Sequence, residues 1–216
     1  MVKFYNRPLS EQDLKLLRGE SSRISQRRKR IRRRAWFSIP ILLVAGIPVS
    51  IALSKLESSG LGYGTYFFIC IVCLFWVWEA INTKQDQKQL SNIEAAIARN
   101  EARVVHCQSN AMVYFEEIED EGADYCFQVE DSRLLFISGQ EFYETTRFPN
   151  TDFELVTAVG NNRYQVLFHI YCHGQKLKPL RVIPADVKKK LALPEHLTVV
   201  EGSLDHLEQL LAVKPK

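Results

Sequence analysis

The sequence predicts an α+β membrane protein, in which a two-helix transmembrane hairpin is followed by a small β-rich domain, a barrel or a sandwich, with short terminal helices. Two apolar runs of membrane-spanning length, 36–54 and 61–81, are joined by a short polar turn. Beyond about residue 104 the hydrophobic pattern changes to the alternation that is typical of β-strands. The expected parts are a basic tail (1–34), the hairpin (35–82), a helical linker or stalk (83–103) and a β-rich domain (104–216).

The hairpin prediction depends on the length and the low charge of the two apolar runs. A helix needs roughly 20 apolar residues to cross a hydrocarbon core about 30 Å thick. The first run contains no charged residue, and the second contains only Glu79, within a turn or so of its end. In the first run Gly46 and Ser50 lie four residues apart, a pair of small residues that lets another helix pack closely. We expect the second run to be the helix that packs there.

Basic residues determine the expected orientation and the expected lipid contacts. Residues 1–34 contain 12 Lys or Arg against 3 Asp or Glu, so the positive charge of the chain is concentrated in this tail. A basic block beside a membrane span resists translocation and attracts anionic lipid headgroups. Both termini are therefore expected in the cytoplasm, at a plasma or inner membrane. The residues expected at the headgroups are Arg27, Arg28, Lys29, Arg30, Arg32, Arg33 and Arg34.

Two helices are expected on either side of the hairpin. Ser10 and Asp13 form a capping pattern for a short helix, which Gly19 is expected to end. In the linker, 83–103, apolar residues recur at helical spacing, and they are Leu90, Ile93 and Ile97. This helix is either a stalk that extends the second span and self-associates, or a helix packed on the soluble domain.

The β-rich domain is predicted from six or seven short alternating segments separated by turn residues. Gly160, Asn161 and Asn162 tolerate the positive φ that a hairpin turn needs. Pro184 opens a short helix, and Ser203 caps a C-terminal helix that is expected to pack across the sheet. A partly acidic stretch, 116–124, is expected to be a solvated hairpin turn.

One connection, 139–152, is longer than a simple hairpin turn and is the predicted partner-binding surface. It combines aromatic residues with Arg, the residue types that contribute most binding energy at interfaces. The candidate residues are Phe142, Tyr143, Arg147 and Phe148. The alternative is structural, because a short helix over 140–146 would let Phe142 plug one end of the domain.

The sequence contains no catalytic motif, and we expect neither an enzyme nor a bound cofactor. Residues of metal-ligating type lack any established zinc spacing, so no metal site is expected. These residues are His106, Cys107, His169, Cys172 and His173. The net negative charge of the chain beyond residue 34 argues against a nucleic-acid partner.

These observations predict a membrane-anchored interaction or assembly module that presents a small β-rich domain at the cytoplasmic face. The expected partners are anionic membrane lipids and other membrane proteins or a second copy of the chain. The alternative is a homo-oligomeric membrane pore or effector that is gated by its cytoplasmic domain.

Overall fold

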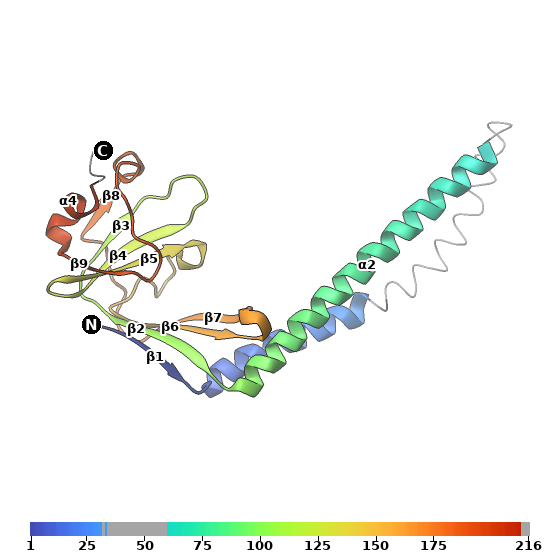
Figure 1. Cartoon of the computed structure of the whole chain (residues 1–216), viewed down its shortest axis with the longest axis horizontal. Coiled ribbons are helices and arrows are strands. Elements are labelled where there is room, and N and C mark those ends of the chain that lie inside the picture. Colours follow the sequence, from blue (N-terminus) through green and yellow to red (C-terminus); the bar gives the residue numbers. More distant parts are fainter. Residues whose placement is uncertain (32, 34–59, 213–216) are drawn as a thin grey trace. The chain divides into compact units, whose positions relative to one another are not determined.

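The computed structural model describes residues 1–31, 33 and 60–212 and divides the chain into two compact units (Figure 1). The first, which we call the β unit, consists of Met1–Arg7, Ala102–Thr157 and Phe168–Lys216. The second, which we call the helical unit, consists of Pro8–Glu101 and Ala158–Leu167. Each unit is therefore assembled from segments that are distant in the sequence.

The strands form two sheets. The four-stranded sheet has the order β1-β2-β6-β7 and consists of β1 (Val2–Arg7), β2 (Ala102–Gln108), β6 (Asp152–Val159) and β7 (Gln165–Cys172). The five-stranded sheet has the order β8-β3-β4-β5-β9 and consists of β8 (Arg181–Ile183), β3 (Met112–Phe115), β4 (Ala123–Glu130), β5 (Arg133–Gly139) and β9 (Val199–Glu201). Each sheet has two edge strands, so the described strands do not close into the barrel that the sequence suggested.

The largest apolar cluster contains side chains from both sheets. Val105 and Cys107 of β2 and Phe153 of β6 are buried together with Tyr125 and Phe127 of β4. The rings of Phe127 and Phe153 lie 5.2 Å apart between centroids, within the range of a favourable aromatic pair. Alternation of side chains along each strand explains this arrangement, because one face of each sheet supplies the apolar residues.

A second apolar cluster covers the other face of the five-stranded sheet. Val113, Cys126 and Phe136 pack with Leu204 and Leu207 of the C-terminal helical segments. These segments are η3 (Leu204–His206) and α4 (Leu207–Leu211), and the Ser203 hydroxyl accepts a hydrogen bond from the Asp205 N–H (3.3 Å). The predicted cap and the packing of the last helix across the sheet are confirmed. The remaining short elements are η1 (Gln140–Phe142), η2 (Asn161–Arg163) and α3 (Ala185–Lys188).

In the helical unit, residues 11–31 form a helix that begins at the predicted cap. The N–H of Ser10 donates to Asp13 Oδ2 (2.9 Å), and the N–H of Asp13 donates to Ser10 Oγ (3.1 Å). The helix does not end at Gly19, because Leu17 and Ile24 are both buried on it and their packing outweighs the poor helix propensity of one glycine.

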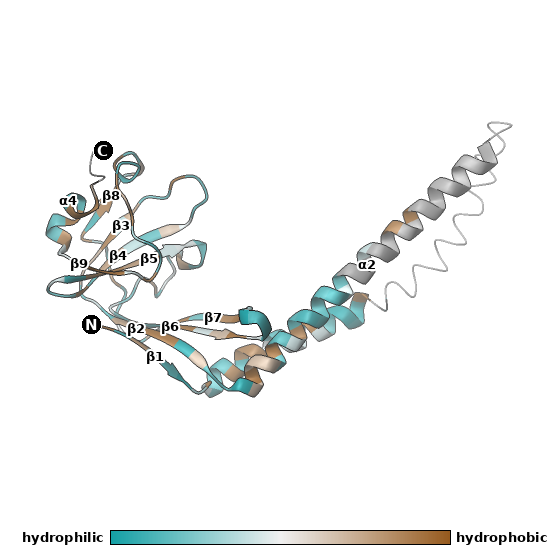
Figure 2. Ribbon diagram, in the orientation of Figure 1, coloured by the Kyte–Doolittle hydropathy of each residue, from teal (hydrophilic) through white to brown (hydrophobic). Residues whose placement is uncertain are grey.

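The second long helix, α2 (Gly60–Arg99), has 40 residues and contains the second apolar run, 61–81. It continues without a break into residues 83–99, many of which are hydrophilic (Figure 2). The linker is therefore part of the same helix.

The predicted transmembrane hairpin is wrong on the evidence of the described residues. In residues 1–31, 33 and 60–212 there is no helix that is both long and apolar enough to cross a membrane. The integral-membrane location with two cytoplasmic termini, which was inferred from the hairpin, is wrong with it. The prediction of the hairpin depended on the length, the hydropathy and the low charge of the two apolar runs. The first run, 36–54, with Gly46 and Ser50, lies outside the described residues.

The loop between β6 and β7 docks on α2 within the helical unit. The Asn92 side chain is buried, and its Oδ1 accepts a hydrogen bond from the N–H of Asn161 (3.1 Å). Arg99 donates to the carbonyl oxygen of Gly160 (3.0 Å). A Cβ on Gly160 would lie 2.5 Å from the carbonyl oxygen of Asn92, so only glycine allows this approach.

We predict that Gly160→Ala lowers the free energy of unfolding by about 1–3 kcal/mol, because the added methyl group meets the backbone of α2. Urea denaturation of the full chain measures this. Gly19→Ala is the matched control, since a Cβ there has no atom within 4 Å, and it should be neutral or stabilising by up to about 1 kcal/mol. Equal effects of the two substitutions would contradict the docking of the loop on α2.

Candidate functional site

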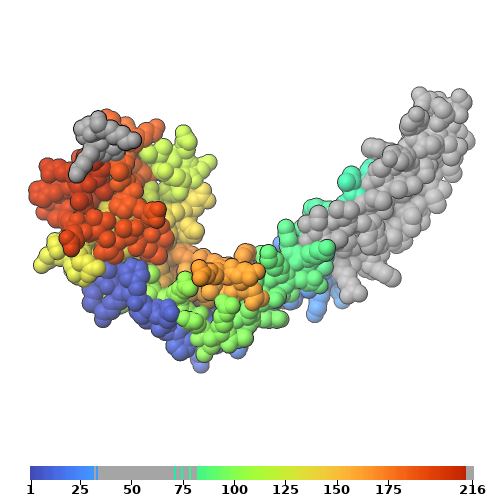
Figure 3. All heavy atoms as spheres, in the orientation of Figure 1, coloured from blue at the N-terminus to red at the C-terminus, as the bar shows by residue number. Residues whose placement is uncertain are grey.

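A groove of about 460 Å³ lies in the β unit between the connection 139–152 and strand β7. The connection is the segment in which the sequence placed the partner-binding residues. The lining residues are Glu141, Thr145, Thr146, Arg147 and Phe148 of the connection and Phe168, His169, Ile170 and Cys172 of β7. Part of the surface of β7, orange in Figure 3, is uncovered on the face in view.

Strand β7 is an edge strand, because β6 is its only neighbour in the sheet order. Just beyond β7 the N–H of His173 donates to the carbonyl oxygen of Asp152 in β6 (2.8 Å). In an antiparallel pair every second residue directs its backbone N–H and C=O groups toward the neighbouring strand. Because His173 does so, the backbone groups of the odd-numbered residues of β7 point toward β6. The N–H and C=O groups of Phe168, Ile170 and Cys172 therefore point away from the sheet. In agreement, the Cys172 carbonyl oxygen accepts a hydrogen bond from the Arg147 guanidinium.

The sequence of β7, QVLFHIYC, contains none of the residues that usually protect an exposed edge. Natural sheets discourage pairing of edges with Lys and other charges, with Pro, or with very short strands. The opposite edge of the same sheet, β1, carries Lys3 and Arg7, and the edges of the other sheet, β8 and β9, have three residues each. Among the described strands, β7 is the edge best suited to accept another strand.

The structure places two of the four predicted partner-binding residues in the core. Phe142 and Phe148 are each 2% exposed, and the Phe142 ring packs edge-on against Phe168, with 5.4 Å between centroids. Of these two residues, only Phe148 lines the groove. The burial of Phe142 agrees with the structural alternative, although only Gln140–Phe142 is helical. Tyr143 and Arg147 are exposed, and these two are free to contact a partner.

Tyr143 points toward the acidic loop. Its hydroxyl donates to Glu117 Oε1 (2.6 Å), and this hydrogen bond, with a smaller contribution from burial, raises the pKa of Tyr143 to about 12. Arg147 is therefore the predicted residue that lies in the groove with its charge exposed.

Asn150, whose positioning role the sequence did not reveal, fixes the connection against the end of β7. Its side chain is buried and makes four hydrogen bonds to backbone groups. The amide nitrogen donates to the carbonyl oxygens of Arg147 (3.0 Å) and Gly174 (3.2 Å), while Oδ1 accepts from the N–H groups of Asp152 (3.0 Å) and Gly174 (2.9 Å). Asn150 is thus a positioning residue for the groove wall. An Asn before a turn is too common a pattern to reveal this role in the sequence.

The groove is lined by two residues of opposite charge, Arg147 and Glu141. The Arg147 guanidinium contacts the Cys172 carbonyl oxygen. Burial lowers the pKa of His196 more than the neighbouring Glu141 raises it. His196 is therefore neutral and does not offset the negative charge of Glu141. The His196 Nδ1 accordingly accepts a hydrogen bond from the N–H of Ser138 (3.1 Å). Burial also raises the pKa of the Cys172 thiol despite the nearby Arg147, so this cysteine stays protonated.

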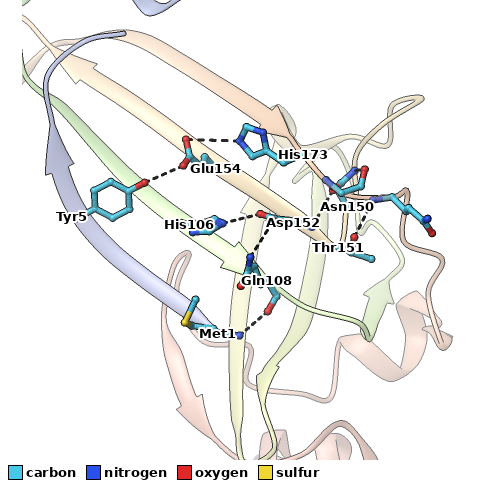
Figure 4. Close-up of polar contacts among 11 residues, drawn as sticks. Met1, Tyr5, His106, Gln108, Asn150, Thr151, Asp152, Glu154 and His173 are labelled. Atoms are coloured by element: carbon cyan, nitrogen blue, oxygen red, sulfur yellow. Dashed lines mark hydrogen bonds and ion pairs between the residues drawn. The ribbon is translucent and has the colours of Figure 1, made fainter.

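A polar network on the four-stranded sheet ties its strands together (Figure 4). Asp152 receives hydrogen bonds from His106 (2.7 Å) and from the Gln108 amide (3.0 Å). Burial alone would raise the pKa of Asp152, but these hydrogen bonds outweigh burial and lower it. Glu154 accepts from the Tyr5 hydroxyl (3.0 Å) and lies 4.0 Å from His173. The network joins β1, β2, β6 and the residue that follows β7. It therefore helps to hold in place the strands on which the edge strand β7 is paired.

Next to this network, burial raises the pKa of the Cys107 thiol to about 12. Within the described residues, no group of three or more His, Cys, Asp and Glu side chains is placed to hold a metal ion. A groove of about 660 Å³ next to the network is lined mainly by polar residues, including Gln108, Thr151 and Asp152.

The acidic stretch 116–124 is not simply a solvated turn. It folds around Lys188, whose side chain is only 3% exposed and forms ion pairs with Glu121 and Asp124. Burial alone would lower the pKa of Lys188, but the two carboxylates outweigh it and raise the pKa. The sequence did not reveal this cluster, because its members are more than 60 residues apart along the chain.

The predicted headgroup residues lie on the N-terminal helix as far as the structure describes them. Arg27, Lys29, Arg30 and Arg33 are exposed, and Arg28 is half-buried. Arg32 and Arg34 lie outside the described residues. Binding of anionic headgroups by this basic segment remains a prediction.

Comparison of the chain with protein-family models, with curated proteins and with solved structures found no match. The function has to be argued from the groove and from the edge of β7.

We predict that Asn150→Asp lowers the free energy of unfolding by about 2–3 kcal/mol. The substitution keeps the shape of the side chain but turns a carboxylate oxygen toward the carbonyl oxygens of Arg147 and Gly174. The exposed Asn110→Asp makes the same chemical change and should alter stability by less than about 0.5 kcal/mol. Thermal melting of both variants of the full chain measures the difference. A tolerated Asn150→Asp would show that the connection is not held through this side chain.

Proposed function

We propose that the chain is a protein-interaction module that binds an extended segment of its partner as an additional strand along β7. The proposal depends on one observation, that an unprotected strand edge and a groove lie side by side. The edge of β7 presents outward backbone groups and no protecting charge, and a groove runs beside it. Addition of a strand to an exposed sheet edge is a recurring mode of peptide recognition.

In this mode the backbone supplies affinity and the groove supplies selectivity. The N–H and C=O groups of Phe168 and Ile170 would pair with the backbone of the added segment. Alternate side chains of that segment would then face the floor formed by Phe148 and Phe168. Arg147 offers a cation at one end, where it favours a carboxylate or a carbonyl group of the partner.

The support for this role is confined to the β unit. We propose neither the membrane anchor nor the oligomeric pore, because both depended on the transmembrane hairpin that the structure contradicts. We propose no catalytic role either, since His106, Asp152 and Glu154 form hydrogen bonds that join strands.

We predict that Ile170→Pro weakens binding of an extended peptide at least tenfold. Proline removes the outward N–H of residue 170 but none of the hydrogen bonds between β6 and β7, and it is tolerated on edge strands. The probe is a twelve-residue peptide selected on the wild-type chain from a displayed random library. Its dissociation constant is measured by calorimetry, and a tenfold change corresponds to about 1.4 kcal/mol.

Ile170→Val is the matched control, because it trims the same side chain but keeps the N–H, and it should bind like the wild type. Circular dichroism confirms that both variants are folded. Unchanged affinity of a folded Ile170→Pro variant would contradict binding at the edge of β7.

A further inference from the structure

The groove between the connection and β7 is closed at the Cys172 end of the strand. The chain that follows β7 crosses to the connection there, because Asn150 and Lys176 pair as a β-bridge. The Lys176 ammonium group also contacts the carbonyl oxygen of Thr145, which lines the groove. A segment that lies along the edge of β7 therefore has to end at this point or leave the groove.

Arg147 is the cation of the closed end that has no acidic partner. Among the residues that the structure describes it forms no ion pair, and its guanidinium contacts a neutral carbonyl group. The neighbouring cation, Lys176, is paired, since its ammonium nitrogen lies 2.6 Å from Glu144 Oε1. Glu141 also lines the groove, but its carboxylate lies beside His196. The closed end therefore favours an anionic group of the partner.

The backbone of Arg147 is fixed, so its guanidinium has a defined position. The N–H of Arg147 donates to Thr145 Oγ1 (3.3 Å), and its carbonyl oxygen accepts from the Asn150 amide (3.0 Å). The side chain contacts the Cys172 carbonyl oxygen through one guanidinium nitrogen. The other N–H groups of the guanidinium can hold a carboxylate while this contact stays in place.

The direction of an added strand decides which end of the partner meets Arg147. A strand parallel to β7 ends there with its α-carboxylate, whereas an antiparallel strand begins there with its α-ammonium group, which the guanidinium repels. An antiparallel strand that covers Cys172 would also donate to the carbonyl oxygen that Arg147 occupies. In a parallel strand that ends there, the donor to this oxygen would belong to a residue beyond the chain end, and Arg147 takes its place.

We infer that β7 accepts the C-terminal end of a partner chain as a parallel strand, with the terminal carboxylate bound by the Arg147 guanidinium and the outward N–H of Cys172. This inference rests on the proposed function, because it names the occupant of the same edge. The N–H of the terminal residue donates to the Ile170 carbonyl oxygen. The residue two positions earlier donates to the Phe168 carbonyl oxygen and accepts from the Ile170 N–H.

The same register predicts which partner side chains enter the groove. Residues that lie opposite one another in a parallel pair direct their side chains to the same face of the sheet. The second and fourth residues from the partner's end lie opposite Ile170 and Phe168, whose side chains pack against the apolar core. Phe148 lines the groove beside them. Apolar side chains are therefore expected at these two positions of the partner.

The probe is a twelve-residue peptide selected on the full chain from a random library that is displayed with a free carboxyl end. Calorimetry measures its dissociation constant as the free acid, as the C-terminal amide and with two glycines added at the carboxyl end. The amide and the extended peptide should each bind at least about tenfold more weakly than the free acid. Arg147→Gln should weaken the free acid by a similar factor and change binding of the amide by less than about twofold, because the amide lacks the charge that Arg147 binds.

Arg133→Gln is the matched control, because it makes the same substitution on β5, where Arg133 pairs with Glu130 (3.2 Å) outside the groove. It should bind the free acid like the wild type. Circular dichroism confirms that both variants are folded. Amidation and extension change only the peptide, so they decide the question even for an Arg147→Gln variant that fails to fold.

Three outcomes would overturn the inference. These are equal affinities of the acid, the amide and the extended peptide, a folded Arg147→Gln variant that binds the free acid like the wild type, and a peptide that loses affinity only when an Asp or Glu side chain within it is neutralised. In each case, weaker binding by Ile170→Pro would uphold the proposed function and refute the terminal carboxylate alone. Insensitivity of peptide binding to Ile170→Pro would refute the proposed function.

Discussion

Backbone N–H and C=O groups that leave water have to find hydrogen-bond partners, and strand β7 meets this requirement on one side only. Its odd-numbered residues face β6, while Phe168 and Ile170 direct their backbone groups away from the sheet. One such group, the Cys172 carbonyl oxygen, is occupied by a side chain, that of Arg147. A side chain covers one group of the edge, whereas a strand covers all of them, which is why we propose that a partner strand binds at this edge.

The rest of the β unit keeps this edge in place. Asn150 uses all its hydrogen-bonding capacity to hold the connection at the end of β7, which fixes the width of the groove. The Asp152 and Glu154 network ties β6 to its neighbours, so the strand that supports β7 cannot shift easily. Phe142 and Phe148 are buried, and the Phe142 ring packs against Phe168 of β7. A preorganised site of this kind loses little entropy when a partner binds.

Local signals in the sequence were sufficient for local structure. The Ser10 and Asp13 cap, the series of short strands and the unusual connection 139–152 could all be recognised, because each depends on residues close together in the chain. Sheet assembly depends on distant segments. β1 pairs with β2 across roughly a hundred residues, so Val2–Arg7 was interpreted as part of a basic tail. The strands form two separate sheets where a barrel was a candidate.

The same limit applies to the site. Arg147 and Tyr143 were identified by residue type, but type alone did not separate them from the buried Phe142 and Phe148, since exposure is set by tertiary packing. Hydrogen exchange of individual amides tests the central claim, the open edge of β7, most directly. In dilute solution the Phe168 and Ile170 amides should exchange rapidly while those of His169 and Tyr171 are protected. Equal protection of all four in dilute solution would show that the edge is already covered within one chain and would contradict the account.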